Sequence, residues 1–448
     1  MKFLNTNDIL SGKKELPSWT LSEVLLKGQA PDKGLFIPER FVFYSPETIK
    51  NLKNKTYAEV AYEILKPYFD DINDKDFKEI IEKAYNNFKA PVIEIEHGIY
   101  ALELFHNNTF AFKDFAAQLL AATIEYILKE KNIKIAVFVG TSGDTGPAIV
   151  ESFYNKKNIT VFCLFPEKGV TEIQRKQMTT LGNNIIPIAV DGDFHDCQEM
   201  AKSALDDKEM KRFNPTSANS INWCRFIPQA VFSFWFYSRV AQFPEEVVLC
   251  IPTGNGGHLG ANLLARKNTG GLPVAKFIAP HNKNNYLVRM IESGKTSVEI
   301  LPTFECLSNA MNVRFPNNIP RILSIYNSDI SVMASEIWPV TITDEKTAET
   351  IKKIYKKTGM ILDVHSAVAY AGAMEFLEKN PSFRNYKTGI FFTAHPAKFP
   401  EKIEKILGFK PPLPNKLKEQ LEKKECNLKR LKAGDKKTLL KIVNEYMS

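Results

Sequence analysis

The chain has 448 residues, a length that favours two or three domains with a large apolar core. Its composition is ordinary for a globular protein, and no run approaches eighteen apolar residues, so we predict a cytoplasmic protein without a membrane span. The net charge is +8, but +5 of it lies after Pro411, where ten Lys and Arg face five Asp and Glu. The rest is nearly balanced, which argues against nucleic acid as a partner.

Cysteine and histidine positions argue against a metal site. The six cysteines are widely scattered, and none of the seven histidines has a partner at a metal-binding spacing. We therefore predict reduced thiols in a reducing compartment and no bound metal.

Helical patterns fill residues 45–90, and strands alternate with helices after about residue 90. The predicted strands are 133–139, 159–165, 185–190, 247–252, 276–279 and 390–393, with helices near 194–206 and 257–267 following two of them. Such alternation over some 300 residues predicts parallel sheets with helices on both faces. Ligands of such sheets bind beyond the carboxyl ends of the strands.

One lysine is enclosed by aromatic residues in the segment Phe110–Phe115, just ahead of an apolar helical pattern. Because a desolvated amine loses its proton more easily, Lys113 is a candidate for a Schiff base with an aldehyde cofactor. An exposed position on an amphipathic helix is the plainer alternative, and the segment alone does not decide between the two.

The first glycine turn, residues 140–146, leaves a predicted strand and enters a predicted helix. Amides at the helix start and the hydroxyls of Thr141, Ser142 and Thr145 can hold a carboxylate or phosphate, although a simple connection is the alternative. It is no Walker loop, because no Lys-Ser or Lys-Thr follows. It is no nucleophile elbow either, because Asp144 stands where glycine is needed.

The second glycine turn, Gly254–Gly257, follows the strand 247–252. Small residues around Asn255 can form a nest of backbone N–H groups for one phosphate, and Leu259 breaks the dinucleotide fingerprint. A third cluster, residues 217–222 with Arg225, suits another anion, although such clusters are more often plain turns. Thr393, at the end of the last strand, can face a ring nitrogen or be a structural threonine.

Together these features resemble the threonine synthase family, the bacterial and fungal long-chain branch of the tryptophan-synthase-β-like enzymes of fold type II. The resemblance covers almost the whole chain, and only the basic tail lacks a matching motif. It rests on residues 28–38, 103–106, 141–146, 217–222, 307–312, 316–318 and 393–399.

The resemblance implies pyridoxal 5′-phosphate as cofactor, with Lys113 as its Schiff-base lysine and proton-moving base. It implies that Gly254, Asn255, Gly256 and Gly257 cradle the cofactor phosphate, that Asp144 lies beside the 3-hydroxyl and that Thr393 faces the pyridine nitrogen. The substrate carboxylate would bind at Thr141, Ser142 and Gly143, and the substrate phosphate at Thr145, Asn219, Ser220 and Arg225.

The reaction implied is a lyase reaction that converts O-phospho-L-homoserine and water to L-threonine and phosphate by β,γ-elimination and replacement. A phospholyase that forms 2-oxobutyrate, phosphate and ammonia is the nearest alternative. A catalytically silent protein that binds RNA through its tail is an alternative of another class.

The sequence pattern places one domain boundary near 90–97 and another at the proline-rich step Pro411–Pro414, which precedes the basic tail. We expect a mostly helical N-terminal domain over 1–96 and a catalytic region of two parallel-sheet α/β units over 97–410. A smaller mobile subdomain is inserted at about 125–215, and a basic helical tail covers 411–448. The sequence leaves a monomer and a homodimer equally open.

Three departures from the family pattern stand out. Asn107-Asn108 replaces a usual Gly-Pro before the lysine segment. In the second glycine turn, Gly256 replaces a common phenylalanine and His258 a common acidic or amide residue. Val364 replaces a frequent proline, which affects loop stiffness more than chemistry.

Overall fold

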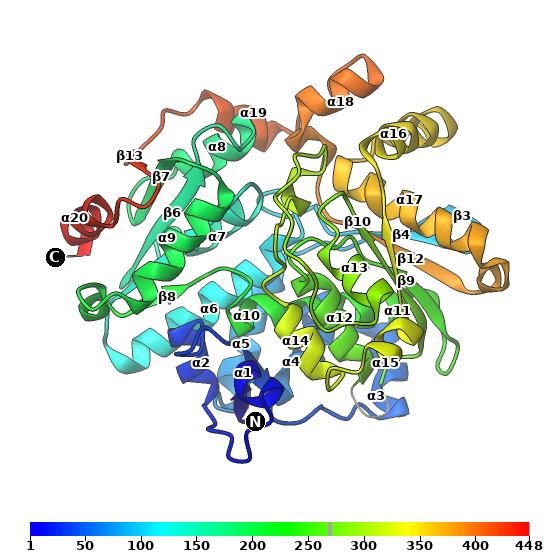
Figure 1. Ribbon diagram of the computed structural model, residues 1–448, viewed down its shortest axis with the longest axis horizontal. Helices are drawn as coiled ribbons and strands as arrows, with labels where there is room; N and C mark the ends of the chain where they lie inside the picture. Colours follow the sequence, from blue (N-terminus) through cyan, green and yellow to red (C-terminus); the bar gives the residue numbers. More distant parts are fainter. Residues whose placement is uncertain (268–270, 448) are drawn as a thin grey trace.

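The computed structural model describes residues 1–267 and 271–447, and its helices and strands form two α/β units above a helical N-terminal region (Figure 1). Both units are built on mainly parallel sheets, of six and of five strands. The α/β class predicted from the sequence is therefore confirmed.

The N-terminal region packs short helices around one antiparallel strand pair. Capping boxes fix two of the helix starts, Thr20 with Glu23 and Thr56 with Glu59, because each satisfies two otherwise free donors. Its elements are β1 (Phe3–Asn5), α1 (Thr6–Leu10), α2 (Leu21–Lys27), β2 (Phe36–Pro38), α3 (Pro46–Asn51), α4 (Tyr57–Leu65) and α5 (Asp74–Tyr85).

The larger sheet has the strand order β11-β10-β9-β12-β4-β3, parallel except for the pair β3 and β4. Its strands are β3 (Val92–Glu96), β4 (Ile99–Glu103), β9 (Val247–Cys250), β10 (Val274–His281), β11 (Ile337–Thr341) and β12 (Lys387–Phe392). The helices of this unit are α10 (Trp223–Phe226), α11 (Val231–Val240), α12 (Gly257–Lys267), α13 (Tyr286–Ser293), α14 (Ile319–Ile325), α15 (Ile330–Glu336), α16 (Asp344–Thr358), α17 (Val364–Lys379) and α18 (Pro400–Leu407).

The smaller sheet is parallel throughout, with the order β13-β7-β6-β5-β8. Its central strands are almost wholly buried, because helices cover both faces. The strands are β5 (Ile135–Gly140), β6 (Ile159–Pro166), β7 (Ile185–Asp191), β8 (Pro215–Ser217) and β13 (Lys429–Lys432), and the helices are α6 (Lys113–Lys131), α7 (Thr145–Phe153), α8 (Glu172–Thr179) and α9 (Phe194–Asp206).

Each predicted strand corresponds to an observed one, and the helices predicted after the first glycine turn and near 194–206 and 257–267 are all present. The tail differs in one respect. Leu417 lies on α19 (Asn415–Glu422), but Leu431 lies on β13, so the tail that we expected to be helical also contains a strand. Helix α20 (Lys436–Met447) follows, and β13 runs beside β7 at the edge of the smaller sheet (Figure 1).

Among the described residues, no helix combines the length and the apolar character that a membrane crossing requires. Strands β5, β9 and β12 all end toward one region between the two sheets, and a glycine turn follows β5 and β9 there.

Candidate active site

One cavity between the two sheets brings the predicted site residues together. Its walls come from the ends of β5, β9 and β12 and from the starts of α6, α7 and α12. Every predicted site residue except Thr141 lines it, namely Lys113, Ser142, Gly143, Asp144, Thr145, Asn219, Ser220, Arg225, Gly254, Asn255, Gly256, Gly257 and Thr393.

Lys113 is the first residue of α6, and its Nζ lies 4.6 Å from the centre of the Phe112 ring. Burial lowers the pKa of Lys113 to about 8, and the positive charge of Arg225 acts in the same direction. Asp144 opposes this shift, while Lys398 adds to it. A fraction of this lysine is therefore neutral near pH 7, as a nucleophilic amine requires.

The segment before Lys113 is held by the segment after β12. The amide of Phe112 donates to the carbonyl of Thr393 over 2.9 Å, and the amide of His395 donates to the carbonyl of Phe110 over 3.0 Å. Phe110 adopts a φ of 61°, which is unusual for a large side chain and marks a tight approach. The lysine and the strand-end threonine are thus fixed relative to each other by the backbone.

Asp114, directly after the lysine, anchors the start of α6. Its carboxylate accepts from the amide of Thr109 over 2.7 Å and from the hydroxyl of Thr109 over 2.5 Å. Burial raises the pKa of Asp114 to about 6, although both Thr109 hydrogen bonds oppose the rise. At the position where the family has Gly-Pro, this chain has Asn107-Asn108. Asn107 accepts a hydrogen bond from the amide of Lys89 over 3.0 Å, and this bond holds the turn in place.

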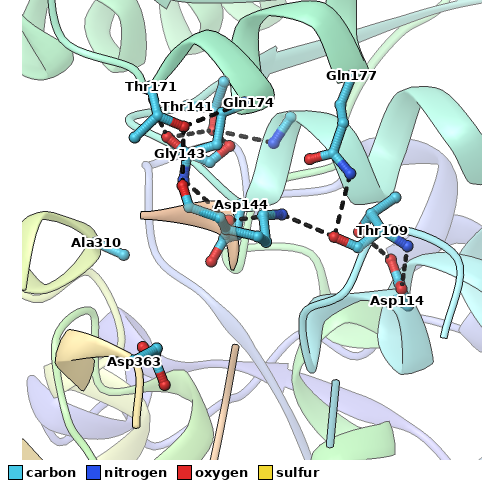
Figure 2. A network of polar contacts seen from close by, with 12 residues as sticks. Thr109, Asp114, Thr141, Gly143, Asp144, Thr171, Gln174, Gln177, Ala310 and Asp363 are labelled. Carbon is cyan, nitrogen blue, oxygen red and sulfur yellow. Dashed lines mark hydrogen bonds and ion pairs between the residues drawn. The ribbon is translucent and has the colours of Figure 1, made fainter. Parts of the chain in front are cut away.

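The first glycine turn is organised by its own side chains. The Thr141 hydroxyl accepts from the amides of Gly143 and Gly146 over 3.1 and 2.9 Å, which explains why it faces the turn and does not line the cavity. Asp144 accepts from Gln174 over 3.0 Å, and Figure 2 shows this contact beside the Thr109–Asp114 pair.

Asp144 is buried at the start of α7 and pairs with Lys398, whose Nζ lies 2.8 Å from its Oδ1. Burial alone would raise the pKa of Asp144, but the Lys398 ammonium, with smaller help from His365 and Gln174, holds it below its ordinary value. The side chain is therefore a carboxylate at neutral pH.

The second glycine turn leads directly into α12, which begins at Gly257. Gly256 has a φ of 74°, a conformation that favours glycine. Within the part of the chain that the structure describes, no protein acceptor takes the amides of residues 254–257. Free amides at a helix start are a binding site for an anion.

Arg225 is buried and lines the same cavity. One of its terminal nitrogens donates to the carbonyl of Ala218 over 3.1 Å, while its Nε has no partner among the described residues. Burial lowers the pKa of Arg225 to about 10, so it remains a cation at neutral pH. A buried guanidinium with an unused donor is suited to an anionic ligand.

Asn219 and Ser220, from the third cluster, hydrogen bond to the first and the second glycine turn respectively. Asn219 accepts from the amide of Gly140 over 3.0 Å and donates to its carbonyl over 2.7 Å. Ser220 accepts from Asn255 over 2.8 Å. The third cluster therefore connects the first glycine turn with the second.

Sequence reasoning assigned no role to two histidines in the cavity wall. The ring of His258 stacks on Phe112 at 4.8 Å, neither of its nitrogens has a partner among the described residues, and burial lowers its pKa to about 3. His365 lies 2.8 Å from Asp363 and accepts from the amide of Ala310 over 3.1 Å. In the sequence, only the departures from the family pattern at His258 and Val364 point to these two histidines.

Comparison with known families places these features. Residues 86–392 match the family described as pyridoxal-phosphate dependent enzyme, residues 9–85 match the threonine synthase N terminus, and residues 366–443 match the threonine synthase C-terminal family. The chain belongs to the threonine synthase family of pyridoxal-phosphate-dependent enzymes.

Individual relatives agree with this assignment. The threonine synthase of Pseudomonas aeruginosa is 34% identical over 93% of this chain and 94% of its own length, and that of Escherichia coli is 36% identical over 90% and 92%. The crystal structure of a threonine synthase from Brucella melitensis with bound cofactor has a TM-score of 0.90 at 30% identity, covering 100% of this chain and 99% of its own. The Escherichia coli structure has a TM-score of 0.89 at 33% identity, covering 100% of both chains.

As a threonine synthase family member, the chain is a pyridoxal-phosphate-dependent lyase, which confirms the predicted family, activity and cofactor. The residues that line the cavity also fit this cofactor, independently of the relatives. A partly neutral lysine suits the aldehyde, free amides suit the phosphate, and the Thr393 hydroxyl has no protein partner among the described residues.

Proposed function

We propose that the chain converts O-phospho-L-homoserine and water into L-threonine and phosphate, with Arg225 binding the phosphate of the substrate. The carrying observation is the buried guanidinium of Arg225, whose Nε has no partner among the described residues and which lines the same cavity as Lys113. A phosphate there would satisfy the free donor and balance the buried charge. Thr145, Asn219 and Ser220 lie in the same wall and complete the proposed phosphate site.

The carboxylate of the substrate is proposed to bind at the first glycine turn. Ser142 and Gly143 line the cavity just before α7, where the Ser142 hydroxyl and the positive end of the helix favour an anion. Thr141 shapes this site through its bonds to Gly143 and Gly146. Two anion sites of this kind would orient a substrate that carries a carboxylate at one end and a phosphate at the other.

We propose that residues 254–257 would hold the cofactor phosphate, that Asp144 would lie beside its 3-hydroxyl and that Thr393 would bond its pyridine nitrogen. When bound, the cofactor supplies an electron sink for the charge left on carbon after a proton departs. The Thr393 hydroxyl is neutral, so it can bond the ring nitrogen without forcing its protonation.

Lys113 is proposed to hold the cofactor and then to move protons at its Nζ. A pKa of about 8 allows this amine both to accept and to release a proton near neutral pH. The Phe112 ring lies against Nζ of this lysine, and the His258 ring stacks on Phe112.

Three further assignments are proposals. We retain the division into 1–96, 97–410 and 411–448, which agrees with a change from helices to alternating strands and helices near residue 90. We propose a cytoplasmic location, since the described cysteines are all free thiols. We propose a monomer or a homodimer, which light scattering would distinguish.

The test is to incubate the purified protein with O-phospho-L-homoserine and measure threonine, phosphate and 2-oxobutyrate together. We expect threonine and phosphate in equal amounts. Mainly 2-oxobutyrate would show a phospholyase and overturn the proposal. The variant Arg225→Met should raise KM for the substrate by about 10- to 100-fold, because a charged hydrogen bond is lost. Arg225→Lys should recover part of the loss.

A further inference from the structure

A buried lysine other than Lys113 lies beside the site and has no role in the reaction described so far. Lys398 ends the short turn Pro396–Lys398 after β12, and its side chain is fully buried. Its Nζ lies 2.8 Å from Oδ1 of Asp144 and donates to the carbonyl of Thr109 over 2.8 Å. Burying an ammonium is costly, so these two contacts must offset a large loss of hydration.

One partner of Lys398 lies in the cavity wall. Asp144 lines the cavity and is held from a second direction by Gln174, over 3.0 Å. Gln174 is positioned by Thr171, whose own hydroxyl donates to the Lys398 carbonyl over 3.1 Å. The orientation of the Asp144 carboxylate is therefore set by a closed group of contacts that contains Lys398.

The other partner leads to Lys113. The carbonyl oxygen of Thr109 accepts a hydrogen bond from the Lys398 ammonium. The amide and the hydroxyl of Thr109 both donate to Asp114, the residue after Lys113. Figure 2 shows Thr109 between Asp144 and Asp114, with Gln177 donating to the same carbonyl over 3.2 Å. One buried cation thus contacts both the first glycine turn and the segment that begins the lysine helix.

From these contacts we propose that Lys398 is a positioning residue for the active site. Its ammonium fixes the Asp144 carboxylate in the cavity wall and, as a second buried positive charge, offsets the attraction of that carboxylate for a proton on Lys113. This inference rests on the proposed position of Asp144 beside the cofactor.

The charges around Lys113 make this role measurable. Arg225 from α10 and Lys398 disfavour its ammonium form, and Asp144 favours it. The ring of His258 from α12 stacks on the Phe112 ring, and burial lowers the pKa of His258 to about 3, so this ring is neutral. Asp144 shifts the pKa of Lys113 more than Lys398 does. Removing Lys398 alone therefore leaves an uncompensated negative charge, whereas removing both side-chain charges does not.

The experiment compares the full-length wild type with Lys398→Met, Asp144→Asn and the double variant. Each protein is freed of cofactor, then mixed with pyridoxal phosphate between pH 6 and 10, and the rate of cofactor capture is followed by the visible absorbance of the lysine-bound form. The midpoint of each rate profile reports the neutral amine of Lys113. All variants meet the same cofactor at the same pH, so the ionisations of the cofactor cancel.

We expect Lys398→Met to raise the midpoint and to slow capture at pH 7 by about tenfold for each pH unit of the rise. Asp144→Asn and the double variant should have midpoints at or below that of the wild type. If Lys398→Met does not fold, the midpoint of the double variant decides the question, because that variant leaves no unpaired buried charge. A midpoint above the wild type in the double variant, or an unchanged midpoint in folded Lys398→Met, would overturn the role.

The readout is separate from the proposed reaction. A wild-type protein that captures the cofactor but makes no threonine would contradict the proposed function, while the order of the midpoints would still decide the role of Lys398.

Discussion

The two glycine turns meet at one cavity, but they are built in opposite ways. In the first, residues 140–146, side chains satisfy the backbone: Thr141 bonds two amides of the turn, and Asp144 is held by Lys398. In the second, residues 254–257, the amides have no protein acceptor within the described ranges. The first turn is therefore shaped before any ligand arrives, while the second requires an anion to satisfy its donors. Similar glycine-rich segments can thus differ in what completes them.

The largest effect should come from removing the group that both turns surround. Lys113→Ala should lower kcat by at least about 10³-fold, because the amine that holds and moves the proton is lost. The free energy of unfolding should stay within about 1 kcal/mol of the wild type, since neither turn hydrogen bonds to this side chain. Steady-state kinetics and urea unfolding measure the two quantities. Retained turnover, or a large loss of stability, would contradict this assignment.

The next largest effect should come from Gly140→Ala, because the first turn is packed more tightly against its neighbours than the second. At Gly140 an added Cβ would lie 2.7 Å from the carbonyl oxygen of Cys197 and 2.9 Å from Cα of Gln198, both in the backbone of α9. Because a helix backbone cannot move aside easily, Gly140→Ala should destabilise the protein by about 3 kcal/mol. Chemical denaturation measures this, and a loss below that of Gly256→Ala would break the comparison.

A smaller effect should come from the hydroxyl that shapes the first turn. Thr141→Val keeps the volume but removes the acceptor of two amides, so we expect a loss of about 1–3 kcal/mol. A rise in KM should accompany it, because the turn would no longer be fixed. Thr141→Ser keeps the hydroxyl and serves as the matched control. Equal behaviour of the two variants would show that the hydroxyl does not organise the turn.

The smallest effect is expected at the second turn. An added Cβ at Gly256 meets nothing closer than 3.5 Å, so Gly256→Ala costs only the strain of its φ of 74°, about 1–2 kcal/mol. Affinity for pyridoxal phosphate should fall by a similar free energy, because the amides face the anion less well. Fluorescence titration of the cofactor measures this affinity. A collapse of folding would show that the second turn is as tightly packed as the first.

Local sequence patterns predicted the α/β class, three inner strands of each sheet and the polar turns that reach the cavity. Buried parallel strands show as short apolar runs, and turns rich in glycine follow them at the ligand edge. Strand β8 was not predicted, because three residues carry little periodic signal. Strand β13 was not predicted because its partner is far away in sequence and its lysines resemble a solvated helix.

The interactions that tune the site were less predictable than its residues. Lys398 lay inside a recognised motif, but its pairing with Asp144 joins segments over 250 positions apart, and no local pattern encodes it. His258 stood out as a departure, yet its stacking on Phe112 depends on how α12 meets α6. The orientation of Thr141 toward its own turn also follows from three-dimensional geometry.

Strand β13 also protects the smaller sheet. Without it, β7 would present an apolar row with unpaired N–H and C=O groups, a template on which another chain could assemble. Leu431 covers part of that row, while Lys432 is exposed on the new edge and Arg430 is exposed in an ion pair with Glu167. Exposed positive side chains repel a further copy of the same edge. We therefore expect that deletion of β13 would expose β7 to edge-to-edge association, with lower solubility as the first sign.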